Sequence, residues 1–144
     1  MPPFVHAMPV GFADVDHAGI VYYPRFFHFF HQAFEALWRE RRGPAAYAEL
    51  IAQRRLGFPA VRAACDFRSP LRFGDLAEVE LRVARLGRTS LTFGYRVVRL
   101  GARERALVAE GEVVCAMVDL ARFVAVPVPA EVQALLADLV EPST

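Results

Sequence analysis

The most constraining feature of this sequence is a long aromatic segment that begins at Pro24. Its apolar side chains recur at helical spacing and form a stripe too broad for a helix lying on a flat surface. Proline suits a helix start, because its missing N–H costs nothing there, and Gly43 suits the end. We therefore expect a helix of about 18 residues, roughly 27 Å long, with a sheet wrapped around it. The stripe consists of Phe26, Phe27, Phe29, Phe30, Ala33, Phe34, Leu37 and Trp38.

Most of the remaining chain alternates apolar and polar residues with the period of two that is typical of strands. Turn residues at Gly74, Gly87 and Gly101 separate these runs by short connections. Parallel crossovers need a dozen or more residues, so we expect antiparallel hairpins. The predicted strands cover residues 4–12 (with Phe12 on the face of Phe4 and Met8), 61–68, 78–83, 91–97, 105–118 and 122–126, and short helices cover 45–55 and 130–139.

These elements predict an α+β fold, in which one long buried helix packs on a curved antiparallel sheet of five or six strands. The chain has 144 residues, a length that suits one domain. We therefore expect a single domain over residues 1–144.

Composition narrows the classes of function and partner. Arginine supplies all 17 basic residues against 16 acidic ones, so a Schiff-base lysine is excluded and nucleic acid is not an expected partner. Neither a signal peptide nor a bilayer-spanning run is evident, so we expect a cytoplasmic protein without membrane insertion. Cys65 and Cys115 lie in apolar strands and are expected to be buried free thiols. His28 and His31 have a metal-binding spacing but no third ligand, so no metal is expected.

The segment just before the long helix carries the most chemistry. It places Asp14, Asp16 and His17 in a loop beside the first N–H groups of that helix, which have no partners within the helix. Such donors can hold the oxyanion that develops on a carbonyl, while Asp16 supplies a nucleophile or general base. Gly19 would let a substrate approach the backbone. The alternative is structural, because an Asp before a helix is most often a cap or part of a solvated turn.

The pattern Asp14-x-Asp16-x-x-Gly19-x-Val21-x-Tyr23 resembles the hot-dog-fold acyl-CoA thioesterases of the 4-hydroxybenzoyl-CoA and Tol–Pal-cluster types. The stretches 57–61 and 86–90 strengthen the resemblance. It implies that Asp16 is the catalytic carboxylate, that the Tyr23 backbone N–H polarises the thioester carbonyl, and that Gly19 lines the approach. It also implies that Asp14 holds the loop.

His17 departs from the family, which commonly has a small residue or proline there. It either assists proton transfer or only fills the loop. His31 stands where the 4-hydroxybenzoyl enzyme uses an acid to recognise the phenolic hydroxyl. The aromatic residues around the site, which are compatible with an aryl or medium acyl group, are Tyr22, Tyr23, Phe26, Phe27 and Phe58. The resemblance, together with this aromatic supply, suggests these further substrate-binding residues: Tyr22, Phe26 and Phe58 for the acyl group, and Arg85, Arg88, Thr89 and Ser90 for the phosphates of coenzyme A. The alternative for the last four is a solvated basic turn.

The resemblance therefore implies hydrolysis of an aryl-CoA (hydroxybenzoyl-CoA-like) or a short- or medium-chain acyl-CoA. Coenzyme A is then part of the substrate, and no separate cofactor is expected. Two alternatives stay open: a non-catalytic acyl-CoA-binding protein, and a hot-dog hydratase or dehydratase. A lone curved sheet leaves an exposed edge strand, so we expect a homodimer at least, and a tetramer of paired dimers.

Overall fold

The computed structural model describes residues 2–142, and its centre is the predicted long helix, α1 (Arg25–Arg42). The helix has 18 residues and begins directly after Pro24. It ends at Gly43, whose φ of 104° lies in the left-handed region that favours glycine. Local sequence signals therefore predicted both ends of α1 correctly.

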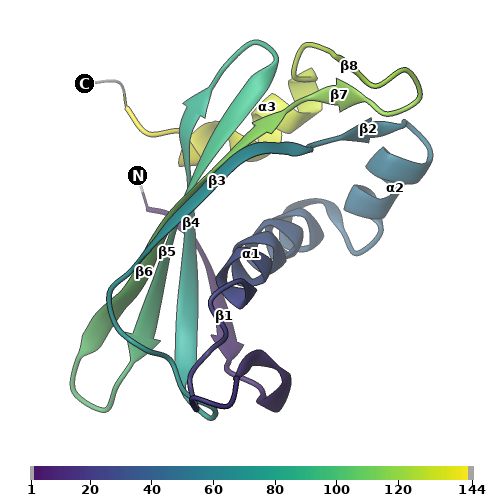
Figure 1. Ribbon diagram of the computed structural model, residues 1–144. Coiled ribbons are helices and arrows are strands. Elements are labelled where there is room, and N and C mark those ends of the chain that lie inside the picture. The colour runs from purple at the N-terminus through teal and green to yellow at the C-terminus, as the bar shows by residue number, and fades with distance from the viewer. Residues whose placement is uncertain (1, 143–144) are drawn as a thin grey trace.

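A five-stranded antiparallel sheet curves around α1, in the order β1-β4-β5-β6-β3 (Figure 1). The α+β arrangement predicted from periodicity is confirmed. The strands are β1 (Phe4–Pro9), β3 (Ala60–Phe67), β4 (Leu76–Leu86), β5 (Ser90–Leu100) and β6 (Arg105–Ala116). The smaller elements are η1 (Phe12–Asp14), α2 (Ala46–Ala52), α3 (Ala130–Leu136), η2 (Ala137–Leu139) and a second sheet of β2 (Leu56–Gly57), β7 (Val118–Asp119) and β8 (Val124–Ala125).

The core lies between α1 and the concave face of the sheet. The helix and the sheet approach each other closely at Phe30, whose ring stacks on Tyr95 with centroids 4.6 Å apart and an interplanar angle of 8°. Gly111 lies beneath the same ring, and a Cβ atom added there would come within 2.3 Å of Phe30. A side chain at 111 would therefore push the helix away from the sheet.

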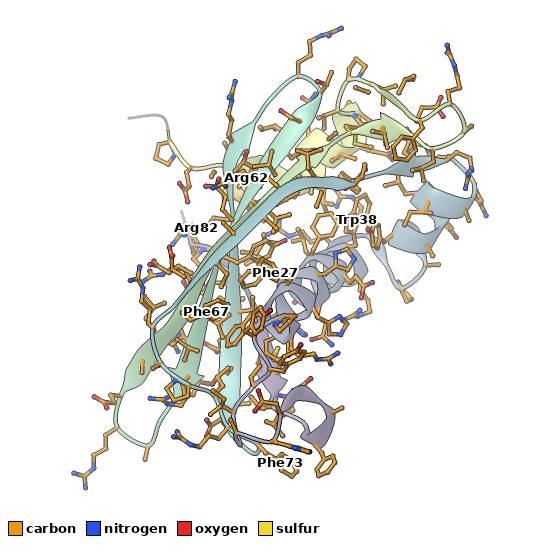
Figure 2. All side chains as sticks on the ribbon, in the orientation of Figure 1. Phe27, Trp38, Arg62, Phe67, Phe73 and Arg82 are labelled. Atoms are coloured by element: carbon orange, nitrogen blue, oxygen red, sulfur yellow. The ribbon has the colours of Figure 1, made fainter. Side chains whose placement is uncertain are left out.

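The first predicted strand, residues 4–12, is shorter than expected, and Phe12 does not share the face of Phe4 and Met8. Pro9 is the last residue of β1, and the chain then turns into η1, so Phe12 is 78% exposed although Phe4 and Met8 are buried. Its ring instead packs edge-on against Phe73, 5.8 Å away, at the end of the molecule (Figure 2).

β3 is an edge strand, and this position explains why one of the two cysteines is less buried than expected. Cys65 on β3 is only partly buried, whereas Cys115 on the neighbouring β6 is buried, and both are free thiols. The predicted strand 105–118 is interrupted at Met117, where β6 ends and β7 begins. Among the described helices, none is long and apolar enough to cross a membrane.

Candidate active site

The loop between η1 and α1 forms a small closed turn. Val15 and Val21 form an antiparallel bridge, and the Asp16 N–H donates to the Ile20 carbonyl at 3.0 Å. Gly19 has a φ of 82° and nothing within 4 Å of an added Cβ atom. A glycine is favoured there because of the backbone conformation and not because of crowding.

Asp14 fastens this loop to the helix. Its carboxylate accepts hydrogen bonds from Arg25 Nη2 at 2.7 Å, Arg25 Nε at 3.1 Å and the Gly11 N–H at 2.8 Å. Its carbonyl accepts the Tyr22 N–H at 2.9 Å. Asp14 is thus a structural residue, as the resemblance implied, and sequence reasoning missed its partner Arg25. The sequence carries no local signal that marks Arg25 as this partner.

Asp16 presents a free carboxylate oxygen at the tip of the turn. Its side chain is exposed, and Oδ1 accepts the Ala18 N–H at 2.8 Å. No described residue donates to Oδ2. One oxygen therefore orients the carboxylate while the other is available to a substrate. His17 is exposed beside it and forms no hydrogen bond or ion pair with the described residues.

The Tyr23 N–H is also available. The N–H groups on either side are used: that of Tyr22 by Asp14, and that of Arg25 by the Tyr22 carbonyl at 2.8 Å. The Tyr23 N–H itself has no acceptor among the described residues, and Pro24 has no N–H. A donor without a protein acceptor among the described residues therefore lies at the positive end of the α1 dipole, a few residues from Asp16.

An apolar cavity of about 200 Å³ extends between α1 and the sheet. His31, Ala60 and Ala63 are its exposed lining residues, which places the mouth between α1 and the edge strand β3. The full lining consists of Phe27, Phe30, His31, Phe34, Phe58, Ala60, Ala63, Phe93, Tyr95, Val113 and Cys115. Sequence reasoning named Phe27, His31 and Phe58 among these but missed the strand residues. The alternation of apolar residues in these strands is visible in the sequence, but the sequence does not show that a cavity lies beside them.

Two predicted substrate-binding residues lie elsewhere. Phe26 is 4% exposed and packs against Phe29 and Phe67, so it belongs to the core, and its neighbour Phe27 lines the cavity instead. Figure 2 shows Phe27 on the side of α1 that faces the sheet. Tyr22 is exposed and packs edge-on against the exposed ring of Tyr23, 5.4 Å away, beside the loop.

The predicted phosphate-binding residues lie at the far end of the sheet from Asp16. β4 runs from Leu76, which pairs with Pro9 near the loop, to Leu86 at the β4–β5 hairpin. Ten residues of strand span about 33 Å, and Figure 1 shows the hairpin and the loop at opposite ends. One chain therefore does not bring Asp16 together with the predicted set, which is Arg85, Arg88, Thr89 and Ser90.

No cluster of three or more His, Cys, Asp or Glu side chains that could hold a metal occurs among the described residues. His31 lies 3.6 Å from Glu35 and is half exposed. The imidazole of His31, which lines the cavity, therefore has a carboxylate beside it.

Comparison with known proteins identifies the family. The model of the thioesterase-like superfamily matches residues 10–136, which include the loop, α1 and the whole cavity lining. The chain belongs to the thioesterase-like superfamily. The predicted resemblance to hot-dog thioesterases is thereby confirmed.

Named relatives within this superfamily are similar over nearly their full length. The acyl-CoA thioesterase YbgC of Haemophilus influenzae is 28% identical over 131 residues, covering 91% of this chain and 92% of that protein. The 1,4-dihydroxy-2-naphthoyl-CoA hydrolase of Synechocystis is 26% identical over 142 residues, covering 99% and 100%. The solved structure of the dynemicin thioesterase has a TM-score of 0.86 at 23% identity, covering 98% of this chain and 99% of that one, and supports the fold alone.

Proposed function

We propose that this member of the thioesterase-like superfamily hydrolyses acyl-CoA thioesters to a free acid and coenzyme A. The observation that carries the proposal is the unpartnered Oδ2 of Asp16 in the same short loop as the unpartnered N–H of Tyr23. Acyl transfer needs this combination, an attacking group beside an oxyanion donor. The relatives named as acyl-CoA hydrolases support the same reaction class.

In the proposed reaction, the thioester carbonyl oxygen accepts a hydrogen bond from the Tyr23 N–H. Asp16 either attacks the carbonyl carbon itself or takes a proton from an attacking water. If water attacks, its oxygen enters the acid directly as the C–S bond breaks. If Asp16 attacks, breaking of the C–S bond leaves a mixed anhydride, which water then hydrolyses to the free acid and free Asp16. In both cases the sulfur of coenzyme A leaves as a thiolate and takes up a proton that comes from the water. Gly19 lets the thioester approach the backbone, and the exposed imidazole of His17 is a candidate to assist the proton transfer.

The acyl group we propose is compact and largely apolar, either a single aryl ring or a short or medium chain. A dry cavity of about 150 Å³ accommodates benzene. The cavity beside α1 has about 200 Å³ and, among its described lining residues, contains no carboxylate or guanidinium. Its size favours one ring over a fused pair of rings.

We also propose a homodimer formed through β3, with pairing of dimers into a tetramer. β3 is an edge strand whose outer row of N–H and C=O groups pairs with no other strand in the described part of the chain, and Val61 and Phe67 on it are 67% and 47% exposed. A second copy would cover this edge and bring its β4–β5 hairpin to the substrate, so Arg85, Arg88, Thr89 and Ser90 would bind phosphates across the interface. Light scattering at micromolar concentration tests this proposal, and a monomer would contradict it.

The function is tested by measuring thiol release from a panel of aryl and aliphatic acyl-CoAs, with Asp16→Asn in parallel. Removing a catalytic acid or base typically lowers the rate by about 10²–10⁴-fold, so the variant should be nearly silent. The matched control is Glu104→Gln, which also converts an exposed carboxylate to an amide and should retain activity. Binding of acyl-CoA without thiol release would contradict hydrolysis and favour a binding protein.

A further inference from the structure

Tyr95 is the one tyrosine that lines the cavity, and its hydroxyl has no hydrogen-bond partner among the described residues. The residue is 4% exposed, and its ring is fixed by stacking on Phe30 beneath α1. A ligand that displaces water from this hydroxyl without offering an acceptor would leave it unpaired, which is unfavourable. A buried polar group is normally paired with protein, water or a ligand.

Tyr95 lines the apolar cavity, and it also borders a second hollow whose other lining residues include Arg82, Arg96 and Glu110. Among the described residues, Trp38 Nε1 is the one fully enclosed side-chain nitrogen or oxygen that lacks a hydrogen-bond partner. The Tyr95 oxygen also lacks a partner but is not in this group, so it is not fully enclosed and a small molecule can reach it. The stacked ring lies on the helix-facing side of the sheet, where the cavity is the hollow that Tyr95 lines.

The hydroxyl is a hydrogen-bond donor at every physiological pH. Burial, with smaller effects of Cys115 and Tyr47, holds the pKa of Tyr95 far above its ordinary value. Burial likewise raises the pKa of the Cys115 thiol, to about 11. The interior of the cavity therefore presents neutral groups, with His31 at its mouth. It favours an uncharged ligand that supplies an oxygen acceptor.

The position of this donor relative to the reacting carbonyl follows from the helix. Phe27 begins the cavity four residues after Tyr23, and Phe30 lies under Tyr95 seven residues after it. At 1.5 Å per residue these offsets are about 6 Å and 10 Å along α1. An acyl group whose carbonyl is held at the Tyr23 N–H would pass Phe27 and bring its far end to Tyr95.

We propose that Tyr95 is a specificity-determining residue, whose hydroxyl donates a hydrogen bond to an oxygen substituent at the far end of the acyl group. The preferred substrates are then uncharged acyl groups that carry a hydroxyl or keto oxygen distal to the thioester. This inference rests on the proposed thioesterase function and adds the chemistry of the acyl group to it.

The test compares matched pairs of CoA thioesters that differ by one distal hydroxyl: benzoyl with 4-hydroxybenzoyl, hexanoyl with 6-hydroxyhexanoyl, and octanoyl with 8-hydroxyoctanoyl. The measured quantity is the ratio of kcat/KM within each pair, for the wild type and for Tyr95→Phe. One hydrogen bond changes such a ratio by about tenfold. In the wild type at least one pair should favour the hydroxylated member by that factor, and Tyr95→Phe should abolish the preference.

Tyr47→Phe is the matched control, because Tyr47 loses the same atom but does not line the cavity. It should keep the wild-type ratio. Thermal unfolding of both variants checks that the fold is retained. Wild-type ratios near one in all three pairs, or a preference that survives in Tyr95→Phe, would overturn this inference while leaving hydrolysis intact. Absence of hydrolysis of every thioester would overturn the proposed function instead.

Discussion

Arg25 Nη2 lies 2.7 Å from Asp14 Oδ1, so that a side chain in the first turn of α1 holds the loop that carries Asp16. The carboxylate is largely buried and Arg25 is about one-third exposed, with side-chain exposures of 12% and 36%. This bond joins the loop that carries Asp16, the carboxylate that we propose as catalytic, to the start of α1, beside the Tyr23 N–H that we propose as the oxyanion donor. The alignment of the two groups therefore depends on Asp14 and Arg25.

We predict that Arg25→Met lowers both stability and kcat. Asp14 keeps the Gly11 N–H but loses its charged partner, which should cost about 1–2 kcal/mol after allowance for the solvent exposure of Arg25. Urea unfolding and steady-state kinetics measure the two effects. Arg41→Met is the control, because Arg41 binds Asp138 at the other end of α1. It should lose stability without a specific loss of kcat, and an equal loss of kcat in both variants would contradict the positioning role.

Gly111→Ala should destabilise the protein by about 1–3 kcal/mol, because the new methyl group would overlap Phe30. Gly94→Ala is the matched control on the adjacent strand, where an added Cβ atom meets nothing within 4 Å. That variant should be neutral or slightly stabilising, since alanine reduces the freedom of the unfolded chain. Chemical denaturation of both proteins measures the difference, and equal effects would refute the close approach of α1 at position 111.

His6 should make stability depend on pH. Burial, aided by Arg39, holds the pKa of His6 below its ordinary value of 6.5. Between the two pKa values, His6 is protonated in the unfolded chain but not in the folded protein, so protonation of His6 favours unfolding. This contribution to stability is complete above about pH 6.5 and is lost as the pH falls toward the lower folded-state pKa.

Urea midpoints measured between pH 8 and pH 5 test this prediction. His6→Gln should flatten the profile in that window, whereas His28→Gln, at an exposed position on α1, should keep the wild-type slope. A profile unchanged by His6→Gln would show that other groups cause the dependence.

The two thiols should react slowly in the native protein. Burial raises the pKa of both Cys65 and Cys115 to about 11. Near pH 8 only about one thiol in a thousand is then the reactive thiolate. Labelling with an aromatic disulfide should therefore be much slower than for free cysteine and should become rapid in urea. Rapid labelling of the folded protein would contradict this expectation and would also interfere with thiol-release assays.

The elements that the sequence predicted best are those determined by close neighbours along the chain. The bounds of α1 follow from Pro24, the helical spacing of its aromatic residues and Gly43, all within twenty residues. The hairpins follow from alternation and glycine turns. The loop with Asp16 and Tyr23 was also recognisable, because its chemistry lies within one short segment.

Phe12 shows where local reasoning fails. Alternation assigned it to the face of Met8, but the register with β4 ends at the pair Pro9–Leu76, and the chain leaves the sheet there. The sequence carries no local signal of where a partner strand ends. The bond between Asp14 and Arg25 was missed for a similar reason, since it depends on the path of the whole intervening loop.

By itself, then, the sequence determined the α+β class, the long central helix and a carboxylate beside its N-terminus, because periodicity and capping act between near neighbours. Only the tertiary structure decided that Phe27 and not Phe26 faces the cavity, and that Tyr95 contributes an unpartnered hydroxyl to it. It also decided that the β4–β5 hairpin lies at the far end of the sheet from Asp16. These relationships depend on how α1 is rotated over the sheet and on strand register, which distant residues set through packing.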